Sequence, residues 1–132
     1  MSTTAAFDPA ALDDEAYKAS VRSGTAEQTA FLLQRVGARV TAAALDLTDA
    51  RPLYRWRDGT EPKEQASVDR LRLLYRIGYE IDRAYGPRVL SAFLRSTNPQ
   101  LGDRAPLIVL AENDPAEVET ELLNATRAFL EG

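Results

Sequence analysis

The segment KEQASVDRLRLLYRIGYEIDRAY, residues 63–85, decides the fold that this sequence predicts. Its apolar residues recur at helical spacing: Leu71, Leu74, Ile81 and Tyr85 fall on one stripe, which also holds Gly78. A 3.6-residue period of this kind is typical of a helix that buries one face. A glycine and a proline follow and end the pattern. We therefore expect the longest helix of the chain here, as the spine of the domain.

Shorter helices are predicted on the N-terminal side of this spine. Thr25 and Gln28 have the spacing of a capping box, in which each side chain bonds the other residue's backbone amide, and apolar residues follow at helical spacing. Residues 39–45 form a short alanine-rich helix and residues 50–57 another, with a polar break at residues 46–49 between them. These segments predict two short helices joined by a tight turn.

On the C-terminal side, proline marks the start of each predicted helix. Helices are expected from Pro87, around residues 106–112 and from Pro115, whose preceding Asp114 is a good N-cap residue. No segment has the pattern of a convincing strand, so we expect an all-α fold. The predicted buried stripe of the last helix consists of Val118, Leu122, Ala125 and Phe129.

Length and composition set the limits on function. The 132 residues are enough for one compact domain, and 45% hydrophobic with 27% charged residues is typical of a soluble globular chain. The absence of cysteine and histidine removes thiolate nucleophiles, disulfides and the usual neutral-pH proton shuttle. The apolar runs are too short to cross a bilayer and no signal segment follows Met1, so we expect a cytoplasmic protein without membrane contact.

The net charge of −4 hides an uneven distribution along the chain. Residues 1–50 carry a charge of −3, residues 51–95 a charge of +4, and residues 96–132 a charge of −5. Local charge, rather than the sum, decides which partners a surface attracts. A basic centre between two acidic flanks favours an anionic partner for the centre.

Residues 39–57, at the start of that centre, have the pattern of a helix-turn-helix. In this motif the second helix enters the major groove of DNA, while nearby arginines neutralise phosphates. Leu53 and Trp56, three residues apart, are expected to anchor the second helix in the core. The outward side then carries the predicted DNA-binding residues, which are Thr48, Arg51, Tyr54, Arg55 and Arg57.

An ordinary structural reading of the same pattern stays open. Arginines on an exposed helix face are commonly just solvated, and an alanine-rich helix before a tryptophan helix is also ordinary packing. Asp46 occupies a turn position that suits glycine better, and Pro52 is tolerated only in the first helical turn. These two residues predict a distorted turn.

Two groups of carboxylates are the only candidates for catalysis or metal binding. They occur at residues 13–15 and at residues 117–121. Acidic clusters on helices are usually solvated, and the second group lies where a helix dipole favours negative charge. No arrangement of nucleophile, base and oxyanion donors is visible. We therefore expect a protein that is not an enzyme, with no catalytic residue, no metal site and no cofactor.

The C-terminal segment FLRSTNPQLGDRAPLIVLAENDPAEVETELLNATRAFLEG, residues 93–132, resembles the toxin-binding domain of the Xre/MbcA/ParS antitoxin family. The resemblance rests on an aromatic residue, an Asn-Pro pair, a Leu-Gly pair and a Pro-Leu-x-x-Leu segment before a last helix that ends in glycine. The segments LTDARPLYRWRDGTEP and RLRLLYRIGYEI are similar to the family's Xre-type helix-turn-helix and linking helix. Together the similar segments cover residues 25–132.

The resemblance implies an antitoxin of a type II toxin–antitoxin system. Members of the family form homodimers, bind operator DNA of their own operon and neutralise a RES-domain toxin that acts on NAD. Their C-terminal end covers the toxin's active site, and an acidic tail is suited to a cleft that normally holds pyrophosphate. Carried onto this chain, the toxin contact falls to Arg127, Phe129, Leu130, Glu131 and Gly132.

The implied organisation has three parts. Residues 1–24 are expected to form an N-terminal arm, residues 25–85 an Xre-like helix-turn-helix region with its linking helix, and residues 86–132 a small helical toxin-binding domain. The alternative is a stand-alone helix-turn-helix transcriptional regulator, whose C-terminal domain dimerises or binds another protein. A nonspecific nucleoid-type protein is a further alternative.

Overall fold

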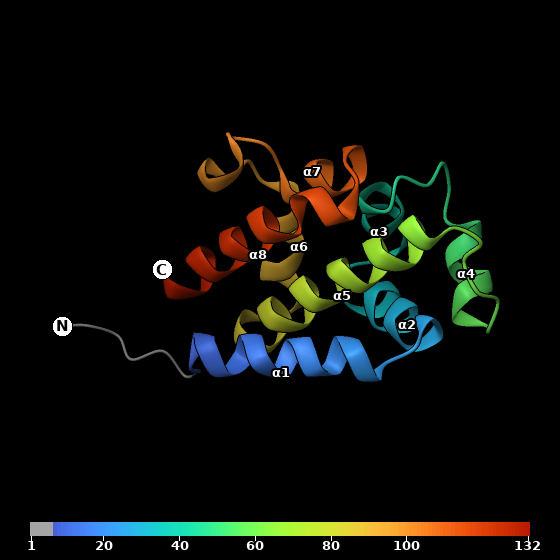
Figure 1. Ribbon diagram of the computed structural model, residues 1–132, viewed down its shortest axis with the longest axis horizontal. Coiled ribbons are helices and arrows are strands. Elements are labelled where there is room, and N and C mark those ends of the chain that lie inside the picture. The colour runs from blue at the N-terminus through green and yellow to red at the C-terminus, as the bar shows by residue number, and fades with distance from the viewer. Residues whose placement is uncertain (1–6) are drawn as a thin grey trace.

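The computed structural model describes residues 7–132, and this part of the chain confirms the all-α class (Figure 1). No strand occurs within residues 7–132, where the only β-type pairing is an isolated bridge between Asn98 and Arg104. The elements are α1 Pro9–Arg22, α2 Thr25–Arg35, α3 Ala38–Ala44, α4 Arg51–Arg57, α5 Gln65–Tyr85, α6 Pro87–Arg95, the 3-10 helix η1 Pro99–Leu101, α7 Pro106–Glu112 and α8 Pro115–Glu131.

Helix α5 is the longest helix, and α1, α2, α6 and α8 pack around it (Figure 1). Leu71, Leu74 and Ile81 are fully buried, as their spacing predicts. Tyr85 differs, because its side chain is 44% exposed although it belongs to the predicted stripe. It is the last residue of the helix, and Gly86 turns the chain away there with a φ of 91°.

The predicted N-terminal arm contains a packed helix. Helix α1 lies against α5 and α8 and buries Leu12 and Ala16. Few apolar residues of α1 contact the core, and carboxylates of this helix form ion pairs with α5 in addition. Asp13 pairs with Arg76 at 3.1 Å, and Glu15 of the same helix pairs with Arg83 at 3.2 Å. Residues 1–6 of the predicted arm lie outside the described residues.

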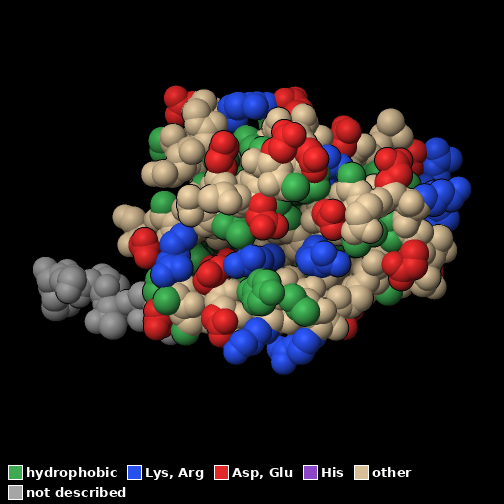
Figure 2. Space-filling view, in the orientation of Figure 1, with side chains coloured by type: hydrophobic (Ala, Val, Ile, Leu, Met, Phe, Trp, Pro, Cys, Tyr) green, Lys and Arg blue, Asp and Glu red, His purple; other side chains and the backbone are tan. Residues whose placement is uncertain are grey.

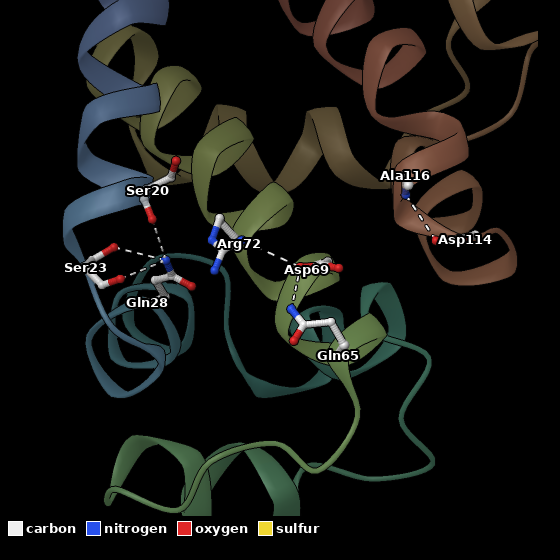
Figure 3. A network of polar contacts seen from close by, with 8 residues as sticks. All are labelled: Ser20, Ser23, Gln28, Gln65, Asp69, Arg72, Asp114 and Ala116. Carbon is white, nitrogen blue, oxygen red and sulfur yellow. Dashed lines mark hydrogen bonds and ion pairs between the residues drawn. The ribbon is translucent and has the colours of Figure 1, made fainter.

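The predicted capping box at the start of α2 is wrong. The N-cap residue is Gly24, which makes no side-chain capping bond. The Gln28 side chain instead donates to the backbone oxygen of Ser20 and to both oxygens of Ser23, at 3.1–3.3 Å (Figure 3). Thr25 donates its hydroxyl to Glu61 at 2.9 Å. Tertiary partners outcompete the local cap because the buried end of α1 carries carbonyl oxygens that need donors.

Gly78 lies on the predicted stripe of α5, where α2 and α6 pack against it. A Cβ atom placed on Gly78 is 3.5 Å from side-chain atoms of Phe31, Leu32 and Leu90. That distance is ordinary van der Waals contact, so the site has room for a single methyl group. Close helix approach therefore does not require glycine here.

We expect Gly78→Ala to raise the free energy of unfolding by about 0.5–1 kcal/mol, because alanine loses less backbone entropy in a helix interior. Urea denaturation measures this change. Gly78→Val is the control, and its further methyl groups overpack the three-helix contact. If Gly78→Ala lowers stability instead, the helices approach more closely than the structure indicates.

Glu80 is a buried carboxyl on α5, in the region where α1 and α8 also pack. Its side chain is 2% exposed. Burial, together with the nearby charge of Asp13, raises the pKa of Glu80 from 4.5 to about 7. Arg76 and Arg127 act in the opposite direction, but they do not outweigh burial. The folded protein therefore holds a proton on Glu80 that the unfolded chain releases at lower pH.

The sign of the resulting pH dependence follows from this raised pKa. Because the folded state binds the extra proton, stability is greatest below pH 4.5 as far as Glu80 is concerned and falls as pH rises through about 7. We expect wild type to lose up to about 3 kcal/mol relative to Glu80→Gln between these limits. Chemical denaturation of both proteins from pH 4 to 8 measures the difference. Parallel stability curves would show that Glu80 is ionised in the folded state.

Candidate functional site

The predicted second helix of the helix-turn-helix is α4, which its apolar residues hold against α2. Leu53 is fully buried and Trp56 is 7% exposed, so the predicted anchoring role of both residues is confirmed. Pro52 lies in the first turn of α4, where the missing amide hydrogen leaves no bond unmade. Burial of Trp56 sets which side of this short helix faces outward.

The turn before α4 departs from the compact form that the sequence suggested. Residues 45–50 connect α3 to α4, whereas a helix-turn-helix typically uses about three or four residues. Asp46 takes the left-handed conformation with φ 58°, as expected of a strained turn position. The two helices do not cross closely at the alanines, because α3 packs against α7 and α2 while α4 packs against α2.

All five predicted DNA-binding residues are exposed and lie together at one end of the molecule. Thr48 precedes α4, and the other four are on α4 itself. Tyr54 is 43% exposed although it is a large aromatic residue. Figure 2 shows Lys and Arg side chains gathered at the right-hand edge of the molecule, where α4 lies. This surface is called the α4 face below and comprises Thr48, Arg51, Tyr54, Arg55 and Arg57.

The three arginines of the α4 face have different partners. Arg51 donates from Nε to Asp49 Oδ1 at 3.0 Å and from Nη2 to Asp49 Oδ2 at 2.8 Å. Arg57 donates to Asp58 at 3.1 Å and places its guanidinium 5.2 Å from the Tyr54 ring centre. Within residues 7–132, Arg55 forms no ion pair.

The bond with Arg51 also changes the electrostatics of Asp49. Hydrogen bonds from the Arg51 side chain and backbone lower the pKa of Asp49 from 3.8 to about 2. The carboxylate therefore stays charged at any physiological pH, and the Asp49–Arg51 pair is neutral as a whole. Positive charge on the α4 face consequently comes chiefly from Arg55.

The predicted toxin-binding residues lie at the end of α8 and have unequal exposure. Phe129, which was predicted to be on the buried stripe, is 38% exposed. Leu130 is 3% exposed and belongs to the core. Arg127 donates to Glu131 at 3.0 Å, four residues along the helix, and Gly132 is exposed. Phe129, Glu131 and Gly132 thus face solvent, whereas Leu130 anchors the end of the helix.

An aromatic cluster around Phe129 is a feature that sequence reasoning did not find. The Phe129 ring lies 5.8 Å from the ring of Tyr85 and 4.9 Å from that of Phe93, measured between centroids. Phe7 packs edge-on against Tyr85 at 5.4 Å. The exposed Tyr85 and Phe129 are called the aromatic end below. The spacing of α5 placed Tyr85 in the core, so the sequence carried no signal for this surface.

A groove between α1, α5 and α8 also went unpredicted. Its volume is about 500 Å³, and its lining residues include Arg72, Asp69 and Ala116, which are labelled in Figure 3. Tyr17 and Val21 of α1 border it and are 51% and 61% exposed. Its charged lining residues are mixed in sign, so the groove has no preference for an anionic or a cationic ligand.

The two predicted acidic groups have structural or solvent-facing positions. Asp13, Asp14 and Glu15 pair with Arg76, Lys18 and Arg83 respectively, which uses the first group to dock and stabilise α1. The second group is exposed along α8. Within residues 7–132, no three Asp, Glu, His or Cys side chains are placed to bind one metal ion. No helix in this part of the chain is long and apolar enough to span a membrane.

The α4 face and the aromatic end lie at opposite ends of the molecule (Figure 1). Helix α4 is at one extreme of the long axis, and the C-terminal end of α8 is near the other. This separation allows two partners to bind without blocking one another.

Comparison with known proteins found no match to any family model, curated protein or solved structure.

Proposed function

We propose that the chain is an antitoxin that binds operator DNA through the α4 face and neutralises a RES-domain toxin through the C-terminal end of α8. The observation that carries the proposal is the α4 face itself. A helix held by buried Leu53 and Trp56 presents arginine and tyrosine side chains outward. Such a surface suits phosphate neutralisation and base contact by one short helix.

The aromatic end supports the toxin half of the proposal. Exposed aromatic residues are enriched where proteins bind each other, since they bury much area at low entropy cost. Phe129 and Tyr85 provide such a surface next to the acidic end of the chain at Glu131 and Gly132. A toxin cleft that holds the pyrophosphate of NAD is cationic and therefore complementary to this end.

In this proposal the protein works in the cytoplasm as a homodimer. Helix-turn-helix proteins commonly pair so that two recognition helices reach half-sites one helical turn apart. The proposed assembly joins two copies of the α4 face on one operator, with each C-terminal end available to a toxin molecule.

We expect the combined variant Arg51→Ala, Arg55→Ala and Arg57→Ala to lose binding to a labelled duplex from upstream of its own coding region. Each lost phosphate contact reduces the steepness of log K against log salt by about 0.9. Fluorescence anisotropy at several salt concentrations measures both effects.

The control for this experiment is Arg88→Ala with Arg95→Ala, which removes two exposed arginines from α6. This control variant keeps the wild-type affinity for the duplex if the α4 face is the DNA contact. Equal losses in both variants would mean that only overall charge matters. Wild-type affinity that is independent of salt would rule out this DNA interface.

We expect co-expression with a RES-domain toxin encoded by a neighbouring gene to restore growth, and Phe129→Ala to weaken that rescue. Removing a centrally placed aromatic side chain from an interface typically costs about 2 kcal/mol or more in binding. Growth scoring and co-purification measure the rescue and the complex.

The matched control is Ile108→Ala on α7, which removes another apolar side chain of 40% exposure. Thermal unfolding of both variants shows whether either change merely destabilises the fold. Glu131→Gln tests the acidic end without disturbing buried Leu130. Full rescue by both C-terminal variants would place the toxin contact elsewhere.

The alternative is a stand-alone helix-turn-helix regulator with a C-terminal domain that dimerises or binds another protein. Two observations favour it. Leu130 is committed to the core, and Arg127 is paired with Glu131 within the helix. Specific DNA binding by wild type together with no effect on any RES-domain toxin would establish this alternative.

A further inference from the structure

Asp49 and Arg51 form a two-point contact at the start of α4. Asp49 Oδ1 accepts from Arg51 Nε at 3.0 Å, and Oδ2 accepts from Nη2 at 2.8 Å. Oδ1 also accepts from the Arg51 backbone amide at 2.8 Å. Two points of contact fix the plane of a guanidinium, whereas one leaves it free to rotate. Arg51 is 81% exposed, so its position comes from Asp49 rather than from packing.

This contact uses only one edge of the Arg51 guanidinium. A guanidinium has five N–H donors, and Asp49 occupies one on Nε and one on Nη2. The end formed by Nη1 and the second hydrogen of Nη2 remains available to a partner. Two parallel donors of this kind match two acceptors on one plane, as in a carboxylate, a phosphate or the O6 and N7 atoms of guanine.

The charge of Asp49 selects between these partners. A phosphate that approaches Arg51 also approaches a carboxylate, and the repulsion offsets the attraction. The edge of guanine carries no net charge, so Asp49 opposes its approach much less than that of a phosphate. Arg55 lies within electrostatic range of Asp49 but forms no ion pair within the described residues, so it is the better phosphate contact of the α4 face.

We propose that Asp49 is a positioning residue that holds Arg51 so that its free edge reads a guanine in the major groove. The inference rests on the proposed DNA binding of the α4 face and adds to it the base that is read. In this arrangement Arg51 supplies sequence discrimination, while Arg55 supplies affinity for the phosphate backbone.

The test compares two duplexes: the sequence upstream of the protein's own coding region, and a random sequence of equal length. Guanines in the first duplex are replaced singly by 7-deazaguanine, which lacks the N7 acceptor. We expect wild type to lose about tenfold in affinity at one guanine of each half-site, in line with a bidentate arginine contact. Arg51→Ala is expected to be insensitive to that replacement.

The variant Asp49→Asn tests whether Asp49 acts by positioning the Arg51 side chain or only by stabilising the turn before α4. Its amide oxygen still accepts from the Arg51 backbone and Nε, but its NH₂ group faces Nη2 with a donor. We expect the 7-deazaguanine effect to shrink several-fold, while affinity for the random duplex stays equal or rises because a negative charge is lost. In an Arg51→Ala background, Asp49→Asn is expected to leave discrimination unchanged, which a purely structural role does not predict.

Asp58→Asn is the matched control, because Asp58 pairs with Arg57 at the other end of α4. It removes the same charge and is expected to change affinity for both duplexes by the same factor. Arg55→Ala is expected to weaken both duplexes equally. Circular dichroism and thermal unfolding confirm that each variant is folded.

The outcomes separate this inference from the proposed function. If wild type binds neither duplex, the DNA-binding function fails and the inference fails with it. If wild type prefers the upstream duplex and Asp49→Asn keeps the full 7-deazaguanine effect, only the inference is overturned. Equal binding of both duplexes by wild type also overturns it, since Arg51 then reads no base.

Discussion

Burial of α5 on nearly all sides is the constraint on which the rest of the structure depends. A helix that buries a single stripe has one packing partner, but α5 has four, namely α1, α2, α6 and α8. Leu71, Leu74 and Ile81 are completely buried within this shell. The free energy gained by hydrophobic burial is roughly proportional to the apolar area removed from water. Because four helices bury apolar side chains against α5, this one helix takes part in most of that stabilising contact. The N- and C-terminal parts of the chain thereby share a single core.

Polar contacts to α5 then determine how the surrounding helices are oriented. Arg35 of α2 pairs with Asp82 at 3.1 Å, and Asp13 of α1 pairs with Arg76. Arg70 donates to the backbone oxygens of Leu110 and Asn113, each at 2.9 Å, and so satisfies carbonyls at the end of α7. Such bonds add little net free energy each, but an unmet buried group costs more, so they favour one arrangement over its alternatives. Several arginines of the basic centre therefore form internal contacts, and only part of the centre's positive charge lies on the α4 face.

The ion pairs of the α4 face bear on the DNA recognition that is proposed for it. Two arginines of equal charge on one short helix serve different purposes when a carboxylate holds one of them and not the other. A neutral, oriented pair is suited to specificity, whereas an unpaired guanidinium is suited to attraction and is screened by salt. The distance between this face and the aromatic end leaves both surfaces accessible at once (Figure 1).

Periodicity and punctuation in the sequence were sufficient for the all-α class, for the long helix, for the anchoring of α4 by Trp56 and for the outward direction of its arginines. These features follow from local spacing, which repeats every 3.6 residues and needs no knowledge of distant neighbours. The packing of α1, the loss of the capping box at Thr25 and the exposure of Tyr85 depended on residues far away in the chain. The pairing of Arg51 with Asp49 needed coordinates as well, although the two residues are close in sequence, because the turn conformation sets where their side chains meet. Local pattern thus determined most of the helices, and the tertiary structure alone decided which polar side chains remain available to a partner, since that depends on which neighbouring groups compete for them.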